Sequence, residues 1–66
     1  MEIGKTYKIK HSRKGTFIAK AVGTDGEWIT VEIVSGVATA MMEYNIAGVG
    51  EQITIRISHI QSFEEV

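Results

Sequence analysis

A pattern of apolar segments separated by turn residues, running from Gly15 to Met42, constrains the fold of this chain more than any other feature. Thr24-Asp25-Gly26 separates two segments rich in β-branched residues, and Ser35-Gly36 precedes a third. Such strand-turn-strand patterns predict antiparallel hairpins. We therefore expect an all-β domain with strands at about 16–23 and 27–34, and a further one at 37–42 or later.

The position of Lys20 indicates which face of the first hairpin points to the core. A two-residue Asp25-Gly26 turn would place Lys20 opposite Val31 on the core face, where a charge is costly. A three-residue loop with Gly26 in the left-handed conformation shifts the register by one and turns Lys20 outward, beside Thr30 and near Glu32. We expect this second register, in which one face collects Phe17, Ala19, Ala21, Ile29, Val31 and Ile33.

The opposite face of the same strands is unusually apolar. A two-residue turn at Ser35-Gly36 would add Ala38, Ala40 and Met42 to the core face. The outer face would then carry Ile18, Val22, Trp28, Val34, Val37 and Met41. Three explanations remain open: the sheet curls strongly, the irregular 43–50 connection covers this face, or the face contacts a partner.

Two further segments alternate with the period of a half-buried strand. Tyr7 and Ile9 would point inward from a strand at 5–11, and Ile53, Ile55 and Ile57 from one at 51–57. A single tight turn at 58–60 would then lead to a short closing strand at 61–65, anchored by Phe63. The 66 residues allow one domain, 1–66, with five strands at about 5–11, 16–23, 27–34, 37–42 or 51–57, and 61–65.

Charge is distributed unevenly along the chain, although the net charge is only -1. The first twenty residues contain six of the seven basic side chains and one acid, whereas the rest contains one arginine and seven acids. Such a split can place opposite potentials on different surfaces. Alternatively, the fold brings the acidic C-terminal strand beside the basic first strand, and the charges balance in space.

Composition argues against most catalytic classes. The chain has no Cys, so thiolate metal sites, disulfides and Cys nucleophiles are excluded. His11 and His59 have no partner at metal-ligand spacing, and no serine or threonine belongs to a recognisable triad. No apolar run approaches the roughly 18 residues of a membrane span. We expect a cytoplasmic protein that is not an enzyme and has no cofactor, no metal and no membrane association.

Several stretches together resemble a known architecture. GKTYKIK at 4–10, a loop ending in Lys14-Gly15, TFIAKAVG at 16–23, GEWITVEI at 26–33 and ITIRISHIQSFEEV at 53–66 look like the five strands of an SH3-like small β-barrel, with its one-turn helix before the last strand. KGTFIAKA is similar to the Lys-Gly-led strand of KOW-type domains in ribosomal proteins and transcription elongation factors. The resemblance implies that the first loop, at His11, Arg13, Lys14 and Gly15, contacts RNA or a polymerase partner.

Two hypotheses for function follow. In the first, the protein is a nucleic-acid-binding accessory module that contacts phosphates and a stacked base through Lys8, Lys10, His11, Arg13, Lys14, Lys20 and Trp28. In the second, it is a protein-interaction or inhibitor module that docks a protein partner or a second copy through Trp28, Val34, Val37 and Met41. Either role is compatible with a phage or mobile-element protein. Exposure of Trp28 beside basic residues would favour the first hypothesis, and exposure among the apolar residues would favour the second.

Overall fold

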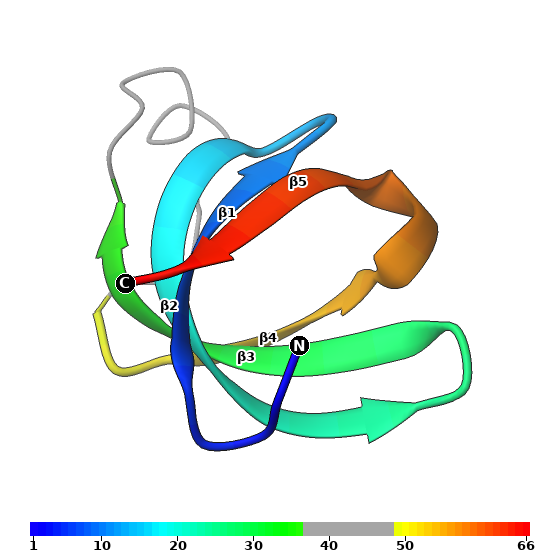
Figure 1. The fold of residues 1–66 in the computed structure, drawn as a ribbon, viewed down its shortest axis with the longest axis horizontal. Coiled ribbons are helices and arrows are strands. Elements are labelled where there is room, and N and C mark those ends of the chain that lie inside the picture. Colours follow the sequence, from blue (N-terminus) through cyan, green and yellow to red (C-terminus); the bar gives the residue numbers. More distant parts are fainter. Residues whose placement is uncertain (37–48) are drawn as a thin grey trace.

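Five antiparallel strands form one strongly curled sheet in the computed structural model, which describes residues 1–36 and 49–66. The strands are β1 (Thr6–His11), β2 (Gly15–Asp25), β3 (Trp28–Gly36), β4 (Gln52–Arg56) and β5 (Ile60–Glu65), in the order β4-β3-β2-β1-β5. The sheet does not close, because β4 and β5 are joined by the one-turn 3-10 helix η1 (Ile57–His59) instead of pairing (Figure 1). Within the described residues no helix has the length and apolar character needed to cross a membrane.

The core lies on the concave face of the sheet, and the alternation of side chains in the sequence predicts it well. Residues at every second position of β1, β2 and β3 are buried, because successive side chains of a strand point to opposite faces. The buried apolar side chains are Tyr7, Ile9, Phe17, Ala19, Ala21, Ile29, Val31, Ile33 and Ile55. Met1 packs against them and lies with Ile29 and Phe63 around a shallow hollow between β3 and β5.

The hairpin between β2 and β3 has the predicted core face but not the predicted loop. Phe17, Ala19 and Ala21 share the core with the alternate residues of β3, and Gly26 has a φ of 60°. However, Asp25 pairs with Trp28, so the loop has two residues and not three. A β-bulge between Ala21 and Gly23 supplies the missing shift of one residue, and Lys20 therefore lies opposite Glu32 instead of Thr30.

Two expectations for the second half of the chain are wrong. Ser35-Gly36 is not a turn, because β3 continues through both residues and pairs them with Ile18 and Phe17. The second neighbour of β3 is β4, with Ile29 opposite Ile55 and Val31 opposite Ile53. Of the two candidates for the fourth strand, 51–57 is therefore confirmed, whereas 37–42 and most of the 43–50 connection lie outside the described residues. Ile57, expected in the core, belongs to η1 and is exposed.

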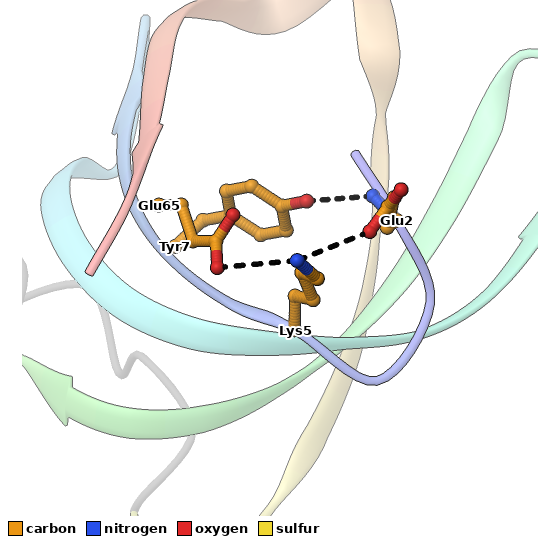
Figure 2. Close-up of polar contacts among 4 residues, drawn as sticks. All are labelled: Glu2, Lys5, Tyr7 and Glu65. Atoms are coloured by element: carbon orange, nitrogen blue, oxygen red, sulfur yellow. Dashed lines mark hydrogen bonds and ion pairs between the residues drawn. The ribbon is translucent and has the colours of Figure 1, made fainter.

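The acidic C-terminal strand lies beside the basic first strand. β5 pairs with β1, which places Glu64 opposite Lys8 and Phe63 opposite Ile9. Lys5 forms ion pairs with Glu2 and Glu65, at 3.4 Å each (Figure 2). These two carboxylates, Glu2 first, raise the pKa of Lys5 above its ordinary 10.5. Part of the sequence asymmetry is therefore balanced within the fold.

Candidate nucleic-acid interface

The loop between β1 and β2 is held at its base by two histidines. Ser12, Arg13 and Lys14 form the loop, and Gly15 closes it with a φ of 76°, a left-handed conformation that suits glycine. The Nδ1 atom of His11 accepts hydrogen bonds from the Arg13 and Lys14 backbone N–H groups, at 3.0 and 3.1 Å. The Ser12 N–H donates to the His59 carbonyl at 2.8 Å. These hydrogen bonds to His11 and His59 therefore fix the backbone of the β1–β2 loop.

Trp28 begins β3 beside the β2–β3 loop, and the curl of the sheet brings it near the β1–β2 loop, because Arg13 and Lys14 line the same depression. The side chain of Trp28 remains 42% exposed. It pairs with Asp25 on β2 and with Arg56 on β4. The guanidinium carbon of Arg56 lies 4.8 Å from the centre of the Trp28 ring, which is within the range of a cation–π contact. No neighbouring atom lies within 4 Å of the position that a Cβ atom on Gly23 would occupy. The indole of Trp28 therefore does not pack over Gly23.

These elements together line a shallow depression of about 190 Å³. We call it the tryptophan surface and define it by Arg13, Lys14, Trp28, Thr54 and Arg56, with His11, Ile55 and His59 beneath. Its described lining contains three permanent cations and no carboxylate, although Asp25 and Glu27 are near Trp28 in sequence. The volume lies below the 300 to 1,000 Å³ of typical small-molecule pockets. A flat aromatic ring framed by cations is suited to a base and its phosphates.

A second hollow, of about 390 Å³, lies between β1 and β5. We call it the β1–β5 groove and define it by Lys8, Lys10, Thr16, Ser62, Phe63 and Glu64. The predicted basic residues are therefore divided among three places. Arg13 and Lys14 lie with Trp28, Lys8 and Lys10 lie in the β1–β5 groove, and Lys20 lines neither.

His11 differs from the other predicted contact residues because it is only 5% exposed. Its imidazole meets that of His59 edge to face, with ring centres 5.7 Å apart. It therefore positions the basic loop instead of facing a ligand. The alternative protein-binding residues are not brought together within the described chain: Val34 is exposed near the other end of β3, and Val37 and Met41 lie outside the described residues.

Comparison with protein-family models, with curated proteins and with solved structures found no match for this chain. Within residues 1–36 and 49–66, no three His, Asp or Glu side chains are grouped as ligands for a metal ion.

Sequence reasoning missed Arg56, Thr54 and His59. The alternation of 51–57 already places Arg56 and Thr54 away from the core isoleucines. What was missing is the pairing of β4 with β3, which sets Arg56 opposite Trp28 and Thr54 opposite Thr30. The hydroxyls of the two threonines lie 2.9 Å apart and link the strands beside the indole.

Protonation of His11 is expected to destabilise the protein. Burial, followed by the positive charge of Lys14 and contributions from His59 and Arg13, lowers the pKa of His11 below its ordinary 6.5. A protonated imidazole would also present an N–H to the two loop amides that now donate to Nδ1. The unfolded chain takes up this proton more readily, so stability is present above about pH 6.5 and is lost as the pH falls below it.

Urea unfolding between pH 7.5 and 5.5 measures this dependence. The His11→Asn variant is the informative one, because its Oδ1 can accept the two amide hydrogen bonds but does not titrate. The unfolding midpoint of the wild type should fall with pH, whereas that of His11→Asn should stay nearly constant. His59→Gln is the control and should retain the fall. Equal pH dependence in wild type and His11→Asn would contradict the role assigned to His11.

Proposed function

We propose that this protein is a non-enzymatic module that binds single-stranded nucleic acid through the tryptophan surface. The observation that carries the proposal is the exposure of Trp28 beside Arg13, Lys14 and Arg56. Proteins that bind single strands combine cations that follow the phosphates with aromatic rings on which bases stack. Both components are present here on one small surface.

A single strand fits this surface better than a duplex. A base can stack on Trp28, or on the guanidinium of Arg56 that lies over the ring, only if it is unpaired and unstacked. The hydrogen bonds from the Arg13 and Lys14 amides to His11 fix the backbone that carries the two cations. Less backbone ordering is then needed on binding, which favours affinity.

The resemblance to SH3-like domains of the KOW type is consistent with this proposal. We infer that the curled five-stranded sheet is an open form of the SH3-like barrel. In that interpretation the loop that KOW-type domains use toward RNA corresponds to Ser12–Lys14, which lines the tryptophan surface through Arg13 and Lys14.

The protein-interaction alternative has less support. Trp28 and Val34 are both exposed, but they lie six positions apart on β3, or about 20 Å along an extended strand. Their surroundings differ as well, because Trp28 lies among cations. A sedimentation experiment that found a stable dimer, together with no oligonucleotide binding, would favour this alternative instead.

A titration with single-stranded oligonucleotides tests the proposal. Trp28 is the only tryptophan in the chain, so stacking of a base should quench the intrinsic fluorescence. With three cations on phosphates and a salt slope of about -0.7 per contact, affinity should fall roughly tenfold to twentyfold from 50 to 200 mM salt. The absence of quenching at low salt would contradict the proposal.

The Lys14→Gln variant should bind a single strand several-fold more weakly than wild type at low salt. Its salt slope should be lower by about 0.7, because one phosphate contact is removed. Lys20→Gln is the matched control, since it removes the same charge from an exposed position outside both hollows. If the two variants weakened binding equally, the cations would act only through net charge, and Lys14 would not be a contact.

A further inference from the structure

The two basic hollows meet at the end of the β1–β2 hairpin. Lys10 pairs with Thr16 on β2 and with Ser62 on β5, and all three line the β1–β5 groove. One residue pair further along, His11 and Gly15 close the hairpin. Beyond them the loop carries Arg13 and Lys14 into the tryptophan surface. A chain of cations therefore continues from one hollow to the other around this loop.

The β1–β5 groove adds two cations to those of the tryptophan surface. Lys8 and Lys10 point to the same face of β1 and are about 7 Å apart along the strand, a separation comparable with that of neighbouring phosphates in an extended nucleic-acid strand. Phe63 lies opposite the buried Ile9 and meets the Tyr7 ring edge to face, with ring centres 5.6 Å apart, so its side chain points to the concave face and away from the two lysines. The hydroxyls of Thr16 and Ser62 add hydrogen-bonding groups.

We propose that a single strand bound at the tryptophan surface continues past the Arg13–Lys14 loop into the β1–β5 groove. There Lys10 and Lys8 contact successive phosphates. This proposal depends on the proposed function and extends it: the binding site combines a stacked base at Trp28 with a second set of phosphate contacts on the same strand. The protein then prefers single strands long enough to reach from Trp28 to Lys8.

Glu64 sets the far end of this path. It lies opposite Lys8 and lines the groove, so its carboxylate opposes a phosphate at that point. Removing the charge should therefore strengthen binding of a long strand and leave a short strand unaffected. A gain of affinity of this kind does not arise from misfolding, which makes Glu64→Gln a useful variant.

The experiment compares labelled oligothymidylates of about 4, 8, 12 and 16 nucleotides, the range that single-strand-binding domains cover. For wild type, affinity should rise about tenfold between the shortest strand and a longer one and then level off, because two phosphate contacts are added. Lys8→Gln combined with Lys10→Gln should remove this rise and preserve binding of the shortest strand. Lys20→Gln should leave the rise in place.

The Glu64→Gln variant gives the converse result. It should bind the longer strands about twofold to fivefold more tightly, with the shortest strand unchanged. Glu51→Gln, at an exposed acid outside the groove, should change neither. If short strands quench Trp28 but affinity does not increase with length, the groove is not part of the site, although the proposed function stands. If no strand quenches Trp28, both proposals fail.

Discussion

Replacing Phe17 with alanine is expected to remove most of the stability of this protein. Phe17 is the largest fully buried side chain in residues 1–36 and 49–66, and it packs on the concave face where β1, β2 and β3 meet. Its neighbours along β2 on this face, Ala19 and Ala21, are small and cannot fill the space that the ring would leave. A buried Phe→Ala substitution costs about 3–5 kcal/mol.

The effect is large because the domain is small. A chain of 66 residues has a free energy of unfolding of roughly 3–10 kcal/mol at the usual stability per residue. Urea denaturation followed by circular dichroism should therefore show the Phe17→Ala variant unfolded, or unfolding at much lower urea. Val34→Ala is the control: the side chain is 43% exposed, and the change should shift the free energy by less than about 0.5 kcal/mol. A Phe17→Ala protein within 1 kcal/mol of wild type would show that Phe17 is not at the centre of the core.

The core could be predicted from the sequence because it depends on local alternation. Phe17, Ala19 and Ala21 occupy every second position of one strand, and the need to keep Lys20 out of the core settles which face they share. Both facts involve neighbouring residues only. The predicted core face is therefore correct although the loop length is not, because the bulge at Val22 supplies the one-residue shift that was expected from a three-residue loop.

Pairing between distant strands could not be predicted in the same way. The choice of β4 as the neighbour of β3 depends on contacts across a long separation in sequence, and two segments alternated well enough to qualify. The same dependence on distant strand pairing explains why Arg56 is absent from the predicted nucleic-acid-binding residues. Arg13, Lys14 and Trp28 were recognisable from their chemistry, but only the pairing of β3 with β4 places Arg56 over the indole.

Folding also changes the meaning of the charge asymmetry. The first twenty residues look uniformly basic, yet Lys5 is paired with Glu2 and Glu65, and Lys8 lies opposite Glu64. Arg13 and Lys14 have no carboxylate among the residues that line their surface with them. The fold thus balances the basic charge near the start of β1 and leaves it unbalanced at the β1–β2 loop, which lines the same surface as the exposed indole.

The Trp28→Ala variant is expected to lose about fivefold to 150-fold in affinity for a short single strand. Base–aromatic stacking contributes about 1–3 kcal/mol per base, and among the described residues that line the tryptophan surface the indole is the only exposed ring. Arg56 would also lose the ring that orients its guanidinium. Because the substitution removes the fluorophore, binding is measured by the anisotropy of a labelled oligonucleotide.

Folding of the variant decides how this loss is interpreted. Trp28 is 42% exposed at the end of its strand, so the thermal unfolding of Trp28→Ala should remain cooperative. Trp28→Tyr keeps a stacking ring and should recover most of the affinity, whereas Val34→Ala, at an exposed apolar position elsewhere on β3, should bind as wild type does. Undiminished binding by a folded Trp28→Ala protein would show that the cations alone hold the strand. The site would then be a phosphate-binding surface without a stacked base, and it would not discriminate single strands from duplex.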